Sequence, residues 1–149
     1  MVHLVVLVAG MSSRFGGKVK QMAKVGPDGE TLIEYSIKQA LTFPFSKIIF
    51  ITNELTEKLF IDIFKDKYMN VDVYYVRQSY DKTIRTRPWG TACAIVSVIN
   101  HIEEPLLMIN GDDIYGIDTF KKGFELVSKT NNNVIGGLKM IDTIPKNGK

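Results

Sequence analysis

The chain has 149 residues, of which 45% are apolar and 23% are charged, and its formal net charge is +3. This length fits one domain, spanning residues 1–149, that buries its core without disulfides or metals, and the composition excludes a disordered chain. The small net charge gives no support for a nucleic-acid partner, and the single cysteine, Cys93, excludes a disulfide within the chain.

The first expected element is a strand at residues 3–9, HLVVLVA, whose continuous apolar run is typical of a central parallel strand covered on both faces. The stretch lacks the cationic start of a signal peptide and is short for one. No apolar segment of the sequence approaches the length of a membrane span. We therefore expect a cytoplasmic protein that does not associate with a membrane.

Helix and strand patterns alternate through the first half of the chain. Thr31 and Glu34 have the spacing of a capping box, which predicts a helix from that point. Residues 47–52 and 71–76 have the apolar pattern of buried strands, and residues 54–67 between them predict an amphipathic helix. The expected inner face of that helix consists of Leu55, Leu59, Phe60, Ile63 and Phe64.

The same alternation continues through the second half. A polar, basic loop at residues 77–88 precedes a helix that is expected to begin near Gly90, and residues 105–110 predict a buried strand. A helix follows, with Asp118 as its expected N-cap, and residues 133–141 predict a last strand. This order of elements predicts the α/β class, with an open, mostly parallel sheet and helices on both of its faces.

Three polar loops follow predicted strands, at residues 9–21, 77–91 and 110–116. In an open parallel sheet, ligands bind beyond the carboxyl ends of the strands. We therefore expect these three loops to converge on one ligand site.

The first of these loops combines small residues with positive charge. Arg14, Lys18, Lys20 and Lys24 form a run of cations without an acid, and the small residues let the backbone approach a ligand closely. The combination favours a polyphosphate cradle, although a glycine-rich turn with a solvated basic surface would have the same composition. The glycine spacing matches neither the P-loop nor the dinucleotide-binding motif.

The third loop carries two neighbouring carboxylates, Asp112 and Asp113. A carboxylate at a strand end, opposite a cationic loop, suits a bound Mg²⁺ ion. Asp112 is the expected ligand because it follows Gly111 directly, and Asp113 either assists it or serves only the turn. The alternative is that the aspartates merely cap backbone amides.

Four further side chains have structural interpretations. Cys93 is expected to be a buried packing residue, and Trp89 is expected in the core. His3 and His101 are expected at surface or capping positions. No cysteine and histidine cluster indicates a zinc site.

Five segments, taken together, resemble one family. LVAGMSSRFGG, KQ, VGPDGETLIEYSI, RPWGTACAI and INGDDIYG are similar, in this order, to the nucleotidyltransferase family of sugar-nucleotide pyrophosphorylases, which includes glucose-1-phosphate thymidylyl- and uridylyltransferases. The resemblance runs from residue 4 to about residue 148. It implies a Rossmann-like, three-layer α/β/α sandwich, and a Mg²⁺-dependent reaction that joins a nucleoside triphosphate to a sugar 1-phosphate and releases pyrophosphate.

The resemblance also implies roles for the matched residues. Arg14 and Lys20 would be the catalytic cations, and Asp112 would bind Mg²⁺. Gln78 would read the base, and a backbone group of Gly90 would also touch it. The other expected nucleotide-binding residues are Ala9, Gly10, Ser12 and Ser13.

Two departures from the family pattern leave alternatives open. Ser12 stands where the sugar-nucleotide branch has glycine, and the motif also resembles that of molybdenum-cofactor cytidylyltransferases. Family members also continue past this sequence into the half that binds the acceptor, which a homo-oligomer or a partner subunit could supply. The alternatives are therefore a non-catalytic nucleotide-binding remnant or regulatory module, and a cytidylyltransferase for a non-sugar acceptor such as the molybdenum cofactor.

Overall fold

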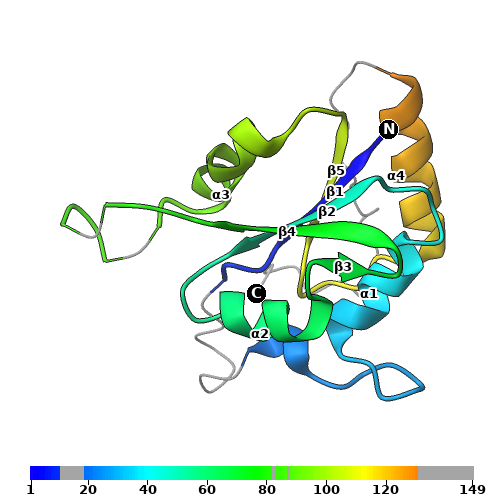
Figure 1. The fold of residues 1–149 in the computed structure, drawn as a ribbon, viewed down its shortest axis with the longest axis horizontal. Helices are drawn as coiled ribbons and strands as arrows, with labels where there is room; N and C mark the ends of the chain where they lie inside the picture. The colour runs from blue at the N-terminus through cyan, green and yellow to red at the C-terminus, as the bar shows by residue number, and fades with distance from the viewer. Residues whose placement is uncertain (11–18, 82, 87, 131–149) are drawn as a thin grey trace, which may run out of the picture.

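A five-stranded sheet forms the centre of the protein (Figure 1). The computed structural model describes residues 1–10, 19–81, 83–86 and 88–130. The strands are β1 (His3–Leu7), β2 (Lys47–Thr52), β3 (Lys67–Tyr68), β4 (Val71–Arg77) and β5 (Leu106–Asn110). Their order across the sheet is β3-β4-β2-β1-β5, and every neighbouring pair is parallel except β3 and β4.

Helices cover both faces of this sheet. Val6 of β1 packs in one core cluster with residues of α1 (Leu32–Ala40), α2 (Glu57–Phe64) and α4 (Ile117–Lys129). Val5 packs in a second cluster with residues of α3 (Thr91–Val98), because successive residues of a strand point to opposite faces. Two short 3-10 helices, η1 (Lys20–Met22) and η2 (Ile99–His101), complete the described elements. No helix in the described ranges is both long enough and apolar enough to cross a membrane.

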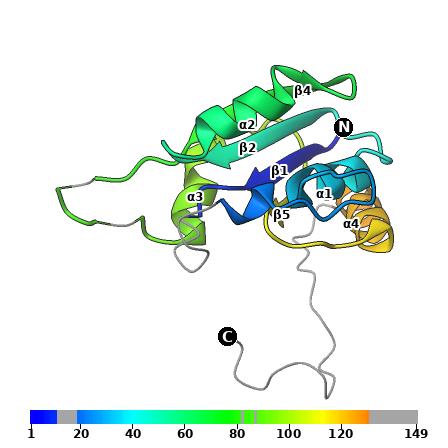
Figure 2. The ribbon, with the colours of Figure 1, turned by 90° about the horizontal axis from the view of Figure 1, so that it is seen from below.

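The parallel strands end at one edge of the sheet. Figure 2 shows the arrowheads of β1 and β2 pointing toward the side from which the segment between β4 and α3 projects. The arrangement confirms the predicted α/β class, with helices on both faces of a mostly parallel sheet.

The strongest local signals of the sequence are confirmed. Residues 47–52 form β2 with the predicted bounds. Thr31 and Glu34 form the predicted capping box at the start of α1, in which Thr31 Oγ1 accepts from the Glu34 amide at 3.3 Å and Glu34 Oε2 accepts from the Thr31 amide at 3.0 Å. Two orphan amides at the helix N-terminus are thereby satisfied.

The predicted helix at residues 54–67 is too long. The structure has α2 at Glu57–Phe64, so Leu55 precedes the helix and is 73% exposed. Leu59 is 41% exposed, whereas Phe60 and Phe64 are fully buried. The helix starts late because the side chain of Asn53 accepts hydrogen bonds from the amides of residues 55 and 56, which forms a turn in place of the first helical residues.

Several smaller predictions are corrected or lie beyond the described ranges. The short antiparallel strand β3 was not predicted, and Gly116, not Asp118, is the N-cap of α4. Cys93 is only half-buried at the start of α3, where its side chain turns toward the carbonyl oxygen of Ser79 at 3.6 Å. His101 is exposed as expected. The predicted strand at residues 133–141 lies outside the described residues.

His3 is buried, with 3% of its surface exposed, although the sequence predicts a surface or capping position. Its Nδ1 lies 3.1 Å from Ser46 Oγ, and the Ser46 hydroxyl donates to the carbonyl oxygen of Val2 at 3.1 Å. Its Nε2 is buried without a hydrogen-bond partner among the described residues. Burial, with a contribution from the charge of Lys47, lowers the pKa of His3 below its ordinary value of 6.5.

Acidification should therefore weaken the fold through His3. The unfolded chain takes up a proton near pH 6.5, before the folded chain does, so the free energy of unfolding should fall as the pH drops below that value. Urea unfolding at pH 7.5 and at pH 5.5 measures the loss. The His3→Asn variant can still form a hydrogen bond with Ser46 but cannot titrate, and its loss over this interval should be smaller. Equal losses in the two proteins would contradict a buried, neutral His3.

Candidate functional site

The three loops singled out by the sequence follow parallel strands that end at the same edge of the sheet. Loop 110–116 follows β5, loop 77–91 follows β4, and the loop after β1 begins at Val8. β4, β2, β1 and β5 are parallel neighbours in this order, so their carboxyl ends form one edge of the sheet, called the carboxyl edge here. The three loops all begin at this edge. For the residues that the structure describes, the loops leave the sheet at one edge, as predicted, while a shared ligand site stays a prediction.

Lys20 and Asp112 meet at this edge. Lys20 Nζ lies 3.3 Å from Asp112 Oδ2, although 92 positions separate the two residues in the chain. The lysine side chain is 44% exposed and the aspartate side chain is 42% exposed. Both charged groups are therefore partly accessible to a ligand.

The close approach of β5 to β1 positions Asp112. The amide of Gly111 donates to the carbonyl oxygen of Leu7 at 2.9 Å. A β-carbon at residue 111 would lie 2.5 Å from Cγ1 of Val8 and 3.1 Å from the same Leu7 oxygen, so only glycine allows this contact. The tight fit holds the next residue, Asp112, directly above the end of β1.

Asp113 serves the turn rather than the edge. Its carboxylate accepts hydrogen bonds from Asn110 Nδ2 at 3.0 Å and from the Tyr115 hydroxyl at 3.4 Å. Burial raises the pKa of Tyr115, which keeps the hydroxyl protonated and able to donate. Ser36 Oγ also donates to the backbone oxygen of Asp113 at 3.1 Å, which ties the turn to α1. Of the two interpretations that the sequence left open for Asp113, the structure favours the turn.

Gln78 and Gly90 lie together at the β4 end of the edge. The side-chain Nε2 of Gln78 donates to the carbonyl oxygen of Gly90 at 3.4 Å. The backbone N–H of Gln78 donates to the carbonyl oxygen of Thr52 at 2.9 Å. Gly90 is the N-cap of α3 with a φ of 92°, a conformation that favours glycine. The structure thus brings together the two residues that the resemblance assigns to the base.

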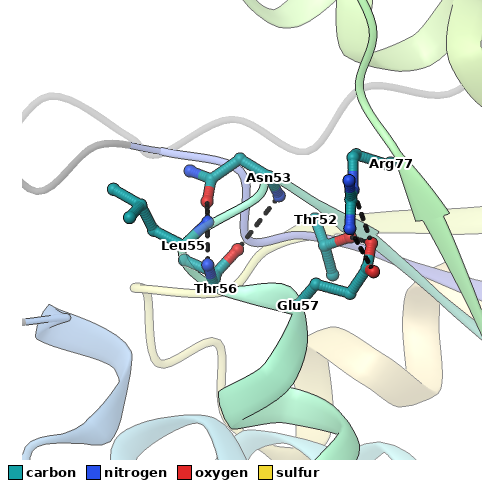
Figure 3. Close-up of polar contacts among 6 residues, drawn as sticks. All are labelled: Thr52, Asn53, Leu55, Thr56, Glu57 and Arg77. Carbon is teal, nitrogen blue, oxygen red and sulfur yellow. Dashed lines mark hydrogen bonds and ion pairs between the residues drawn. The ribbon is translucent and has the colours of Figure 1, made fainter.

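Asn53 is a residue of the edge that the sequence analysis missed. Its Nδ2 donates to the carbonyl oxygen of Ala9 at 2.8 Å, and its Oδ1 accepts from the amides of Leu55 and Thr56, both at 2.8 Å. Thr56 Oγ1 in turn accepts from the Asn53 amide at 3.0 Å, which Figure 3 shows. Asn53 therefore fixes the backbone at Ala9, where the first loop leaves the sheet.

A second fixed group lies beside Asn53 in Figure 3. Arg77 binds both carboxylate oxygens of Glu57, with Nε to Oε2 at 3.0 Å and a terminal nitrogen to Oε1 at 2.6 Å. Thr52 Oγ1 also donates to Glu57 Oε2 at 3.1 Å. The arginine lowers the pKa of Glu57, so this carboxylate stays charged and holds the end of β4 just before Gln78.

The remaining expected residues divide into two groups. Ala9 is buried two residues after β1, and Gly10 is exposed, with no described atom within 4 Å of a β-carbon built at its position. Ser12, Ser13 and Arg14 lie outside the described residues. Of the expected site residues that the structure describes, Lys20 and Asp112 form one pair and Gln78 and Gly90 form another.

The sequence of the chain matches a known family. The family model of the MobA-like NTP transferase domain matches residues 4–115. The UTP–glucose-1-phosphate uridylyltransferase AglF of Haloferax volcanii is 28% identical over 115 residues, which cover 74% of this chain and 43% of that protein.

Solved structures share the fold. HddC from Yersinia pseudotuberculosis, complexed with GMP-PN, has a TM-score of 0.63 at 24% identity, over 84% of this chain and 53% of that one. A UDP-glucose pyrophosphorylase complexed with UDP-glucose has a TM-score of 0.64 at 20% identity, with the same shares covered. The chain therefore spans about half the length of these relatives.

The Asn53→Asp variant should lose stability through one hydrogen bond. The new carboxylate still accepts from the two amides, but it cannot donate to the buried oxygen of Ala9, so the free energy of unfolding should fall by about 1–3 kcal/mol at neutral pH. Urea unfolding measures the loss, which should shrink near pH 3 where the carboxyl group regains a proton. Asn100→Asp, at an exposed position, is the matched control. Equal stabilities of the two variants would contradict the contact with Ala9.

Gly111→Ala should also destabilise the fold, because its β-carbon would overlap with β1. We expect a loss of about 1–3 kcal/mol in the free energy of unfolding, measured by urea denaturation. Gly10→Ala adds the same atom where no described atom lies within 4 Å, and its stability should equal or slightly exceed that of the wild type. A Gly111→Ala variant as stable as Gly10→Ala would refute the close approach of β5 to β1.

Proposed function

The chain belongs to the family of MobA-like NTP transferase domains, and on this premise we propose that it transfers a nucleotidyl group from a nucleoside triphosphate to a sugar 1-phosphate. The observation that carries the proposal is the pair of Lys20 and Asp112 at the carboxyl edge of the sheet. The name of the relative from Haloferax volcanii, with UTP and glucose 1-phosphate as substrates, supports the choice of substrate class.

The proposed reaction is an in-line displacement at the α-phosphorus of the triphosphate. A phosphate oxygen of the acceptor attacks this phosphorus, the bond to the bridging oxygen breaks, and pyrophosphate leaves. Both reactants are anions that repel each other, so positioning and neutralisation of charge supply most of the catalysis. No nucleophile from the protein is needed. We assign the neutralisation to Lys20 and, on the resemblance, to Arg14.

The contact between Lys20 and Asp112 suits an exchange of partners. Lys20 Nζ lies 3.3 Å from Asp112 Oδ2 and both side chains are partly exposed, so their pairing contributes little to stability. A triphosphate at the edge offers Lys20 several anionic oxygens in place of one carboxylate oxygen. Lys20 then binds phosphate, and the carboxylate of Asp112 becomes available to a cation.

The donor set at Asp112 fits Mg²⁺ when phosphate takes part. Among the residues that the structure describes, no three or more histidine, cysteine or acidic side chains are grouped as a metal site. Mg²⁺ commonly binds one or two carboxylates together with substrate phosphates and water. We propose that Asp112 holds the ion, which when bound supplies further neutralisation of the phosphate charge.

Gln78 and Gly90 are proposed to bind the base. The amide of a glutamine can donate and accept, so it can pair with the polar edge of uracil, thymine or cytosine. Gln78 follows β4 and Gly90 caps α3, whereas Lys20 begins η1 and Asp112 follows β5. These positions support a nucleotide that lies along the carboxyl edge.

A second candidate is a module that binds nucleotides without transfer. It would use the same described groups, with Lys20 and Asp112 at the phosphates and Gln78 and Gly90 at the base.

Pyrophosphate release tests the proposal. Purified protein with Mg²⁺, each nucleoside triphosphate and a panel of sugar 1-phosphates should release pyrophosphate with at least one pair. Lys20→Ala should reduce kcat by about 10²–10³-fold, by analogy with the loss of one oxyanion donor, and Asp112→Asn should reduce it at least as much. The neighbouring Asp113→Asn is the control and should stay within about threefold of wild type, since its carboxylate serves the turn.

The same experiment separates the two candidates. Calorimetric binding of a triphosphate without release of pyrophosphate for any acceptor would support the binding module and exclude the transferase. Full activity in Asp112→Asn would show that the metal assignment is wrong.

A further inference from the structure

Trp89 is the single tryptophan of the chain, and the prediction that it lies in the core is wrong. In the structure it is 66% exposed. It lies directly before Gly90 in the segment that joins β4 to α3, which Figure 1 shows projecting beyond the ends of the strands. Exposure alone does not identify a role, because single apolar side chains are common on protein surfaces. The surroundings of this ring are more informative.

Arg85 covers one face of the indole ring. The central carbon of its guanidinium group lies 4.2 Å from the ring centroid, which is a cation–π contact. Because one face is covered and most of the side chain is still exposed, the opposite face is open to a planar ligand.

Local hydrogen bonds hold Arg85 in place. Asp81 Oδ1 accepts from the amide of Thr83 at 2.8 Å and from its hydroxyl at 2.6 Å. The backbone oxygen of Asp81 accepts from the amide of Arg85 at 3.1 Å. This turn fixes the residue that stacks on the ring, so the open face is presented in a set orientation before any ligand arrives.

The ring is also one residue from the pair that we propose for the base. Gln78 Nε2 contacts the carbonyl oxygen of Gly90 at 3.4 Å, and the thiol of Cys93 lies 3.6 Å from the carbonyl oxygen of Ser79. These two contacts hold the start of the segment against the start of α3, with Trp89 beside them.

We propose that the open face of Trp89 stacks on the base of the bound nucleoside triphosphate, an inference that rests on the proposed function. The indole supplies apolar and π contact to any base, because every base has a π face. Gln78 meets the polar edge of the base. Trp89 therefore raises affinity for nucleotides in general, and Gln78 discriminates among them.

Intrinsic fluorescence gives a direct test, since Trp89 is the single tryptophan. Titration of the wild type with UTP, CTP, GTP and ATP, each with Mg²⁺, should quench the emission of Trp89 to saturation. Inorganic tripolyphosphate carries the same kind of charge without a base and should leave the emission unchanged. Emission that changes with protein concentration but not with nucleotide would assign the ring to a contact between copies of the chain and overturn the proposal.

Calorimetry of variants gives the second test. Trp89→Ala should weaken the binding of the preferred triphosphate by about 5- to 150-fold, the range expected for loss of one stacked base. Trp89→Phe should restore most of this affinity. Ile84→Ala is the matched control, because Ile84 is 70% exposed in the same segment, and it should bind as the wild type does. The affinity for tripolyphosphate should be the same in all four proteins.

The outcomes distinguish this inference from the proposed function. If the wild type binds no triphosphate, both fail. If it binds one and Trp89→Ala binds it equally well, the stacking role is wrong while the proposed function stands.

Discussion

The register of the parallel strands is the constraint on which the rest of the molecule depends. Leu7 of β1 pairs with Ile51 of β2 and with Asn110 of β5, and Thr52 of β2 pairs with Arg77 of β4. The strand ends are therefore level, and the residues that follow them leave the sheet at the same height. A shift of one residue would turn the buried side chains to the wrong face, so the apolar core enforces this alignment. The site needs no contact of its own to bring its loops together.

The carboxyl edge has two chemically different ends as a result of the strand order. The charged pair of Lys20 and Asp112 lies at β1 and β5, whereas Gln78, Gly90 and Trp89 follow β4. β2 lies between them and contributes Asn53, which uses its whole side chain to hold backbone atoms. A nucleotide has the same division, with charge at one end and an uncharged ring at the other. This correspondence supports the orientation that we propose for it.

The sequence was sufficient for the features that depend on local pattern. The capping box of Thr31 and Glu34 and the bounds of β2 follow from neighbouring residues alone, and both were predicted correctly. Features that depend on contacts between distant residues were not predicted correctly. The apolar periodicity around Leu55 suggested a longer helix, because the turn made by Asn53 competes with the first helical residues. His3, which is buried, forms its side-chain hydrogen bond with Ser46, a residue that follows α1 in the sequence.

The site shows the same limit. Asn53 is invisible to motif analysis because its partner, the carbonyl oxygen of Ala9, is a backbone atom in the loop after β1. Its position after a strand and before a helix is typical of a turn-forming asparagine, and that signal could have identified the turn but not the contact. Trp89 was predicted in the core from its residue type alone, whereas its environment is set by Arg85 and by a turn at Asp81. Lys20 and Asp112 were predicted at one site because both follow strands of one parallel sheet and because the family resemblance gives both a role there. Their direct contact was not predicted.

Two ion pairs among the described residues of the edge, Arg77 with Glu57 and Lys20 with Asp112, differ in how firmly their partners are held. Arg77 holds Glu57 through two hydrogen bonds, and Thr52 adds a third, so a competing anion would have to break a network of fixed geometry. Lys20 contacts Asp112 at the longer distance of 3.3 Å, with a flexible side chain that carries a compact charge. A bidentate arginine at position 20 would hold the carboxylate in the same rigid way and oppose its release to a cation. The proposed transfer requires both kinds of pair, because the strand ends must stay in place while the charged groups between them change partners.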